Sequence, residues 1–218
     1  ATGSESNKVS VISSTERRLK IPFKNQLGRP RFAIMDPSTM LSLDKQQLQN
    51  GAVDAMTHVL EQYMTSPVNT PIQYGFSETI MKVLVEWGPV LVETCSLDAC
   101  ENVMWAANQA LNGLIGAGVP EDWSTHMIGH AITALYGVDH ARTLTMIMPS
   151  LMRYKIKDKE KMLARLARNV FNVDEMNDAK AAEIGIQKVE EFMSSMGCPV
   201  RISETGIDIS SDDLIELL

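Results

Sequence analysis

Cysteine is scarce in this sequence of 218 residues, which contains only Cys95, Cys100 and Cys198. The number is odd, and no two of the three stand in Cys-x-x-Cys spacing. A disulfide framework and a zinc ribbon are therefore excluded as the basis of the fold. Scarce, unpaired cysteine is typical of a reducing compartment, and we expect a cytoplasmic protein.

Long hydrophobic runs are also missing. The longest apolar stretches, such as residues 110–120 with their three glycines, are much shorter than the roughly 20 residues that a membrane-spanning helix needs. The sequence opens with ATGSES, which is polar turn chemistry and contains no basic and then apolar leader. We expect no membrane partner and no export, and we interpret the opening as a cut inside a larger protein.

Basic residues are in deficit, with 20 Lys and Arg against 27 Asp and Glu and a net charge of -7. This is the wrong sign for a surface that neutralises phosphates, so nucleic acid and anionic membrane are excluded as partners. The hydrophobic content of 44% is enough to bury a core. The sequence therefore predicts a globular protein, or a piece of one.

The pattern of apolar residues predicts a mainly α fold with a short β-rich start. Two β-branched stretches at 9–12 and 19–23 are typical of a hairpin, and a third short strand is expected at 32–35. Helical spacing dominates after that point. We expect a β-rich segment over residues 1–36, followed by a helical domain over residues 37–218.

Glycine, proline and polar caps predict where the helices begin and end. Asn50-Gly51 is expected to break the first helix, and Gly88-Pro89 is expected to divide the second. Asp98 and Glu101 have the spacing of a capping box before the third. The expected helices cover residues 52–65, 71–87, 103–115, 122–135, 144–155, 159–169 and 178–196.

The histidines carry the strongest chemical signal, because three of the four lie between residues 126 and 140. Asp54 and His58 are four residues apart, which places both on one face of a helix about 5 to 6 Å apart. His126 and His130 repeat this spacing on a second helix, and His140 follows in the loop after Gly137. Two helices and a loop could therefore converge on one cation.

Simpler explanations exist for each pair alone. An Asp-x-x-x-His pair is more often a surface or capping pair than a metal site, and His-x-x-x-His without the Glu of His-Glu-x-x-His needs no metal. The context favours a metal, because His126 and His130 lie among apolar residues such as Met127 and Ile132. Polar groups that face a core need partners, and one metal ion would satisfy all of them.

Four stretches carry a resemblance to a known family: ATGSES, GAVDAMTHVLEQYMT, MWAANQALNGLIGAGVPEDWSTHMIGHAITALYGVDHARTL and MGCPVRISETGID. They closely resemble the iron-containing (group III) alcohol dehydrogenases, and within them the NADPH-dependent aldehyde reductase and butanol dehydrogenase branch. The resemblance covers nearly the whole chain and implies a dehydroquinate synthase-like helical metal-binding domain. It implies one Asp and three His as ligands of the catalytic metal, here Asp54, His58, His126 and His140.

The resemblance also implies a nucleotide-binding half, of which these 218 residues contain only a part. Family members carry a Gly-Gly-Gly-Ser phosphate-binding turn, and this sequence contains none. Residues 1–36 are then the remnant of the nucleotide-binding domain. Thr2, Asn7 and Lys20 match positions near the cofactor, although a Thr-Gly-Ser turn and a hairpin lysine need no cofactor to explain them.

Two residues depart from the family pattern. Ala131 replaces a glutamate that many relatives have after the second histidine of the His-x-x-x-His pair, and Tyr136 replaces a histidine sometimes found before the last ligand. The four expected ligands are unchanged. The departures bear on the surroundings of the metal and on substrate preference.

The resemblance implies hydride transfer between a nicotinamide, NADPH rather than NADH, and a short-chain aldehyde or primary alcohol. The metal is Fe2+ or Zn2+, and the affinity order favours zinc wherever both are available. The intact enzyme is expected to be a homodimer. His130 is expected to be a catalytic residue that faces the cleft without binding the metal, the alternative being a core histidine bonded to a backbone carbonyl.

Two other functions remain open at the level of the sequence. The chain could be a helical metal-binding module that is not catalytically competent by itself, because it completes no dinucleotide site. It could also be an enzyme of the dehydroquinate synthase or glycerol dehydrogenase type, although those relatives generally use fewer histidine ligands. In either case an apolar surface normally covered by another domain is expected to be exposed.

Overall fold

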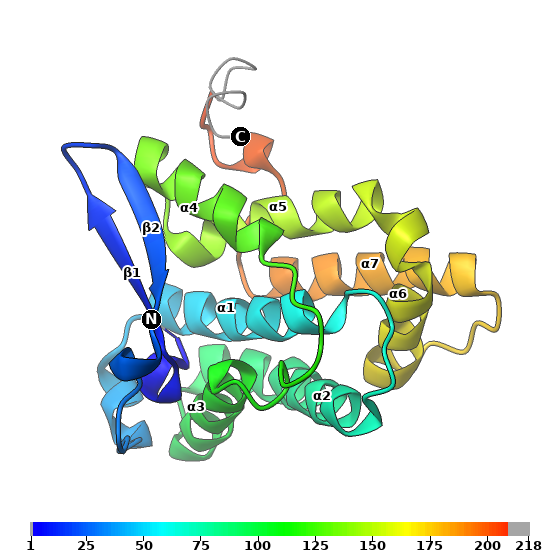
Figure 1. The fold of residues 1–218 in the computed structure, drawn as a ribbon, viewed down its shortest axis with the longest axis horizontal. Helices are drawn as coiled ribbons and strands as arrows, with labels where there is room; N and C mark the ends of the chain where they lie inside the picture. Colours follow the sequence, from blue (N-terminus) through cyan, green and yellow to red (C-terminus); the bar gives the residue numbers. More distant parts are fainter. Residues whose placement is uncertain (1, 209–218) are drawn as a thin grey trace.

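The computed structural model describes residues 2–208, so the last ten residues of the predicted helical domain lie outside the described residues. The fold is mainly α, as the sequence predicts, with one hairpin before the helices (Figure 1). None of the described helices is long and apolar enough to cross a membrane. The elements are β1 Val9–Ser14, β2 Leu19–Lys24, α1 Lys45–Tyr63, α2 Pro71–Thr94, α3 Leu97–Leu111, α4 Ser124–Tyr136, α5 His140–Tyr154, α6 Ile156–Phe171 and α7 Asp178–Ser195.

The predicted hairpin is confirmed. Strands β1 and β2 pair antiparallel, with Val9 opposite Lys24 and Ser14 opposite Leu19. The hairpin stands at one side of the helices, and β2 lies against α4 (Figure 1). At its turn, the Arg18 guanidinium donates to the carbonyl of Leu135 at the end of α4. The hairpin therefore borders the helix that carries two of the histidines.

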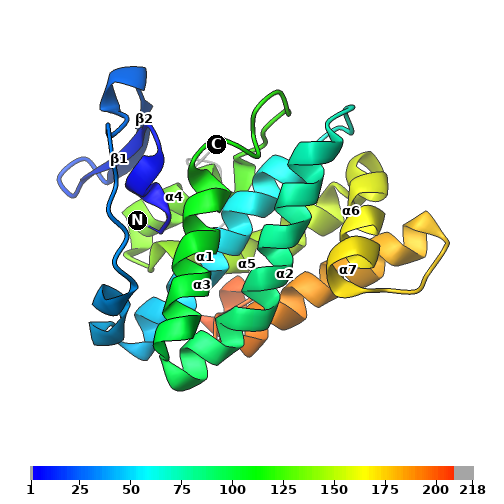
Figure 2. The same ribbon diagram turned by 90° about the horizontal axis from the view of Figure 1, so that it is seen from below.

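Helix α1 is the centre of the molecule. It lies between α2 and α3 on one side and α4 and α5 on the other, and Figure 2 shows α1, α2 and α3 side by side. Every residue from Ala52 to Thr65 is buried, so this part of α1 has no solvent-facing side. Its apolar residues form the core, and each of its polar side chains must find a partner inside the protein.

Two of the expected helix breaks are wrong. Helix α1 runs unbroken through Asn50-Gly51, and α2 runs unbroken through Gly88-Pro89. In α1 the capping carboxylate of Asp44 and the burial of the following turns outweigh the roughly 1 kcal/mol that a glycine costs inside a helix. In α2 the buried Gly88 packs against α1 while Pro89 is exposed, so packing holds the helix together across the proline.

Two other expected boundaries are also wrong. Residues 32–35 form no strand, and no described strand pairs with them; Phe32 is 80% exposed. Helix α3 begins at Leu97 rather than at 103, and its cap is Ser96, which accepts from the Ala99 N–H, so Asp98 and Glu101 do not form the cap. Cys95 has a left-handed conformation that ends α2, and this places the next helix start immediately after it.

Candidate metal centre

The buried polar residues of α1 differ in whether they have a hydrogen-bond partner within the described part of the protein. The Thr57 hydroxyl donates to the Val53 carbonyl, and the Gln62 amide donates to the carbonyls of His58 and Ala110. Tyr63 donates to Glu78. Asp54 and His58 have no comparable hydrogen bond, although each is only 6% exposed. This is the pattern expected of buried polar groups that bind a shared ligand.

Helices α4 and α5 bring two further histidines to this part of α1. His126 lies in the first turn of α4, and His140 is the first residue of α5. The sequence placed His140 in a loop, which is wrong, because α5 begins directly after Asp139. The Asp139 carboxylate accepts from Gln46 at 2.6 Å and from Asn50 at 3.2 Å, so α1 anchors the start of α5.

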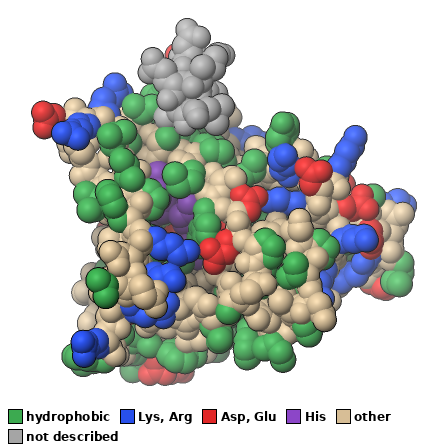
Figure 3. Space-filling view, in the orientation of Figure 1, with side chains coloured by type: hydrophobic (Ala, Val, Ile, Leu, Met, Phe, Trp, Pro, Cys, Tyr) green, Lys and Arg blue, Asp and Glu red, His purple; other side chains and the backbone are tan. Residues whose placement is uncertain are grey.

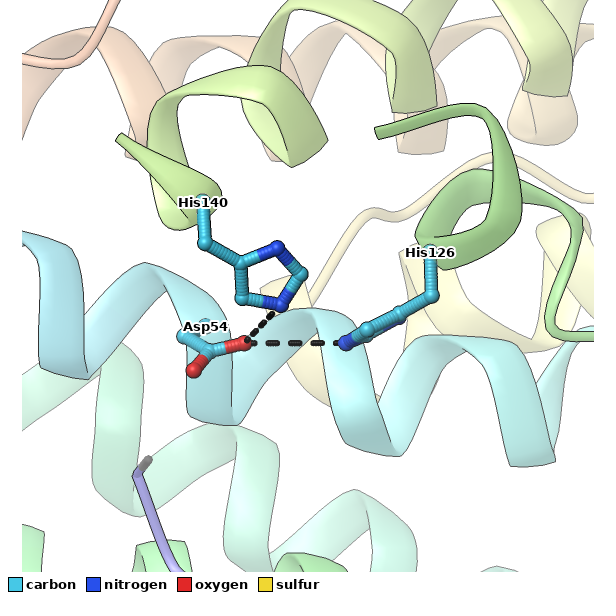
Figure 4. A group of neighbouring side chains, drawn as sticks. All are labelled: Asp54, His126 and His140. Carbon is cyan, nitrogen blue, oxygen red and sulfur yellow. Dashed lines mark ion pairs between the residues drawn. The ribbon is translucent and has the colours of Figure 1, made fainter. Parts of the chain in front are cut away.

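Three imidazoles converge on one carboxylate oxygen, and Figure 4 shows two of them, those of His126 and His140, beside Asp54. The Nε2 atoms of His58, His126 and His140 lie 3.4, 3.7 and 3.9 Å from Oδ1 of Asp54. The ligand atoms of Asp54, His126 and His140 all lie within 4.8 Å of one another. The rings of His58 and His126 stack with their centroids 4.9 Å apart. The four residues that the sequence singled out therefore surround one point.

The distances suit a shared cation better than direct bonding. At 3.4 to 3.9 Å the Nε2 atoms are too far from Oδ1 for good hydrogen bonds. Two ligands about 2.1 Å from one tetrahedral ion are about 3.4 Å apart. Within the described part of the chain, Oδ1 of Asp54 and Nε2 of His126 are buried without a hydrogen-bond partner. The donor set therefore fits a divalent metal.

Electrostatics at the cluster follow from burial and from the single carboxylate. Burial by itself raises the pKa of Asp54. The nearby imidazoles, His58 foremost, lower this pKa by more than burial raises it, so the net shift is downward. Burial lowers the pKa of His58 to about 4 and that of His140 to about 3. Burial also acts to lower the pKa of His126, but Asp54 and Glu61 outweigh it and raise this pKa to about 9. At neutral pH Asp54 is a carboxylate, and His58 and His140 are neutral and able to donate a lone pair.

His130 and Lys20 lie beside the cluster. The His130 ring is 4.9 Å from the ring of His140 and 6.0 Å from that of His126. Burial first, and then the charge of Lys20, lower the pKa of His130 to about 4. Burial lowers the pKa of Lys20, opposed by the attraction of Asp54. Figure 3 shows histidine side chains at the surface beside the hairpin, so the cluster is accessible from this side.

Thr2 and Asn7 belong to a turn that packs on α3 and α1. Gly3 has a left-handed conformation, and any Cβ there would collide with the Ala107 carbonyl oxygen. Asn7 is buried and its Oδ1 accepts the Val9 N–H, which is a structural role. A Cβ on Gly51 would lie 3.7 Å from the Thr2 hydroxyl oxygen. Thr2 therefore lies against α1 at Gly51, about one helical turn before Asp54.

Glu61 is a residue of the site that sequence reasoning missed. It is 4% exposed, and its carboxylate contacts Nδ1 of His126. The available signal was an acidic residue in an apolar helix, seven positions after Asp54 and therefore on the same face.

Comparison with known proteins identifies the family of this chain. The model of the C-terminal part of the Fe-containing alcohol dehydrogenase family matches residues 49–216. The chain therefore belongs to the Fe-containing alcohol dehydrogenase family. The match includes every residue of the cluster around Asp54.

Relatives within the family are reductases and dehydrogenases. NADPH-dependent aldehyde reductase YqhD of Escherichia coli (strain K12) is 45% identical over 212 residues, which cover 97% of this chain and 55% of the relative. NADH-dependent butanol dehydrogenase A of Clostridium acetobutylicum is 31% identical over 221 residues, covering 100% of this chain and 56% of the relative. The crystal structure of E. coli K-12 YqhD superposes with a TM-score of 0.95 at 42% identity, covering 100% of this chain and 57% of the other. The chain thus spans about half the length of the curated relatives it matches.

Proposed function

We propose that this chain is the metal-binding part of an NAD(P)H-dependent alcohol dehydrogenase that interconverts short-chain aldehydes and primary alcohols. The observation that carries the proposal is the convergence of three Nε2 atoms on Oδ1 of Asp54. The printed names of the relatives support the reaction class.

Asp54, His58, His126 and His140 would hold the metal. Three imidazole nitrogens and one carboxylate oxygen suit Fe2+ or Zn2+. When bound, such a cation supplies positive charge that polarises a carbonyl oxygen and stabilises developing alkoxide charge. The chain itself excludes water from three sides of this point, because α1, α4 and α5 bury the ligands.

The residues on the open side would serve cofactor and substrate. Lys20 on β2 and Thr2 in the opening turn are proposed to contact the nicotinamide cofactor, and the Asn7 amide NH2 would donate to it. His130 is proposed as the residue that exchanges a proton with the alcohol oxygen, or that contacts the nicotinamide. Its ring lies 4.9 Å from that of His140, beside the proposed metal site, and its Nδ1 has no hydrogen-bond partner among the described residues.

We propose NADPH ahead of NADH. YqhD, which is named as NADPH-dependent, is 45% identical to this chain, whereas a butanol dehydrogenase of Bacillus subtilis named as NADH-dependent is 34% identical.

We also propose that residues 1–36 belong to the nucleotide-binding part of the enzyme and residues 37–218 to the metal-binding part. Apolar side chains on both faces of the hairpin support this, because Val11 is 43% exposed on one face, and Ile12 is 59% and Phe23 53% exposed on the other. Such side chains are expected to be covered in the complete enzyme.

Metal analysis of ligand variants tests the proposed function. Asp54→Ala and His126→Ala each remove a ligand, and we expect metal content to fall from about one equivalent per chain to near zero, measured by elemental analysis after loading with Zn2+ or Fe2+. His130→Ala is the matched control, since it removes a buried imidazole from the same helix and should leave metal content unchanged. Full metal content in both ligand variants would contradict the site, and loss in His130→Ala would make His130 a ligand.

A further inference from the structure

Glu61 is a buried carboxylate that the proposed ligand set does not use. It lies on α1 two helical turns after Asp54, and its carboxylate contacts the first turn of α4. A carboxylate that is only 4% exposed requires strong hydrogen-bond donors.

Those donors come from one residue of the site. Oε1 of Glu61 accepts the backbone N–H of His126 at 3.2 Å, and Oε2 contacts Nδ1 of the same residue. The Glu61 backbone carbonyl accepts the N–H of Asp122 at 3.0 Å, which aligns the segment that leads into α4. The side-chain carboxylate and the backbone carbonyl of Glu61 therefore bind residues at the start of α4 and just before it.

The start of α4 needs this contact. Its N-cap residue is Trp123, which provides no side-chain cap. Oδ1 of Asp122 accepts the Ser124 N–H, whereas the acceptor of the His126 N–H is on another helix. Glu61 provides an acceptor from the neighbouring helix, and its negative charge also suits the positive end of the helix dipole.

The same contact determines which His126 nitrogen faces Asp54. A carboxylate at Nδ1 accepts a hydrogen bond from the Nδ1–H group, so in the neutral imidazole the lone pair is on Nε2. Nε2 is the atom that lies 3.7 Å from Oδ1 of Asp54. Among the described residues, Nδ1 of His58 and Nδ1 of His140 have no hydrogen-bond partner, so His126 is treated differently from the other two imidazoles.

We propose that Glu61 is a positioning residue, which sets the ring orientation and tautomer of His126 and strengthens Nε2 as a metal ligand. The inference rests on the metal site proposed above, and it assigns a role to a residue outside that ligand set. A carboxylate behind a metal-binding imidazole raises its basicity, and losing such a partner typically lowers metal affinity about 10- to 100-fold.

Two variants of Glu61 and one control test the role. Glu61→Ala removes both contacts, and Glu61→Gln keeps an amide oxygen that can still accept from Nδ1 but removes the charge. Glu101→Gln makes the same chemical change at an exposed position of α3. Zn2+ affinity is measured by competition with a chelator. We expect affinity to fall about 10- to 100-fold in Glu61→Ala, less in Glu61→Gln, and not at all in Glu101→Gln.

A second readout separates positioning from a general loss of stability. Long-range 1H–15N NMR spectra report which imidazole nitrogen carries the proton, and the chain has only four histidines to assign. In the metal-free wild type, at a pH above the His126 pKa of about 9 where this imidazole is neutral, we expect the Nδ1–H tautomer of His126, retained in Glu61→Gln and lost in Glu61→Ala. Circular dichroism checks that each variant is folded, and if Glu61→Ala is not, the affinity of Glu61→Gln decides.

The failures of the two proposals are distinguishable. If the wild type binds no metal, the proposed function fails, while the tautomer of metal-free His126 still tests the role of Glu61. If the wild type binds metal and both Glu61 variants bind it equally well with an unchanged His126 tautomer, Glu61 is not a positioning residue.

Discussion

At the scale of single residues, the buried polar groups of this protein fall into two kinds. One kind is fully paired inside the chain: Oε1 of Glu78 accepts from Tyr63 at 2.7 Å, from Arg165 at 2.5 Å and from Asn169 at 3.0 Å. The other kind is Asp54 with the three imidazoles around it, whose ligand atoms lie close together without forming good hydrogen bonds to one another. The first kind stabilises the fold, and the second is the place where we propose a ligand.

The Glu78 group predicts how stability depends on pH. Burial acts to raise the pKa of Glu78, but hydrogen bonds from Arg165 and others outweigh it and lower the pKa below its ordinary value of 4.5. A depressed carboxyl pKa contributes stability that is present above about 4.5 and is lost as pH falls through the lower, folded-state pKa. Glu78→Gln should therefore lower the free energy of unfolding by about 2 kcal/mol at pH 7, allowing for the partial exposure of Arg165.

Urea unfolding of wild type and Glu78→Gln at pH 7 and pH 3 measures this. The difference between the two proteins should be smaller at pH 3, because this pH lies below the ordinary carboxyl pKa of 4.5 and the stability that the lowered pKa of Glu78 provides is lost as pH falls below that value. Glu86→Gln, at an exposed position of the same helix, should change little at either pH. An equal difference at both pH values would show that the charge of Glu78 does not stabilise the fold.

At the scale of elements, close helix packing rather than local propensity decides where glycine is required. Helices α6 and α7 pack tightly against each other, and Gly185 of α7 lies at their interface. A Cβ on Gly185 would lie 2.9 Å from the Leu163 carbonyl oxygen, which is backbone and moves little. In α2, by contrast, a Cβ on Gly75 would meet nothing within 4 Å.

Gly185→Ala and Gly75→Ala should therefore have opposite effects. Overpacking in Gly185→Ala should lower the free energy of unfolding by about 1–3 kcal/mol, more than the better helix propensity of alanine returns. Gly75→Ala should raise it by up to about 1 kcal/mol. Urea unfolding curves measure both, and stabilisation by Gly185→Ala would contradict the close α6 and α7 packing.

At the scale of the whole molecule, all the residues of the proposed metal site lie within this chain, whereas the proposed cofactor contacts are few. The relatives that carry the reductase and dehydrogenase names are nearly twice as long as the segment matched here. The sequence also contains no Gly-Gly-Gly-Ser turn for the phosphates of a dinucleotide.

We therefore expect the 218-residue chain to bind a divalent metal and to show no NADPH oxidation with short-chain aldehydes. Absorbance at the NADPH band, with the metal-loaded chain and butanal, measures this. Saturable turnover that Asp54→Ala abolishes would contradict the expectation and would show that this chain completes a nucleotide site by itself.

The sequence by itself determined the features that depend on local spacing. Two β-branched stretches on either side of a polar segment predicted the hairpin. A four-residue spacing placed Asp54 with His58, because that spacing is about one helical turn wherever the helix lies. The helix breaks predicted at Asn50-Gly51 and Gly88-Pro89 were wrong. Packing around a buried helix outweighs the cost of about 1 kcal/mol that a glycine adds inside a helix, and in α2 it also outweighs the cost of the proline.

The tertiary structure alone decided how the site is assembled. Whether His126 and His140 reach Asp54 depends on how α4 and α5 pack on α1, and no local spacing relates these three residues. Glu61 shows the same limit, since its partner His126 lies on another helix. Helical geometry is a property of neighbouring residues, whereas the meeting of three helices depends on the complementary buried surfaces of the whole chain.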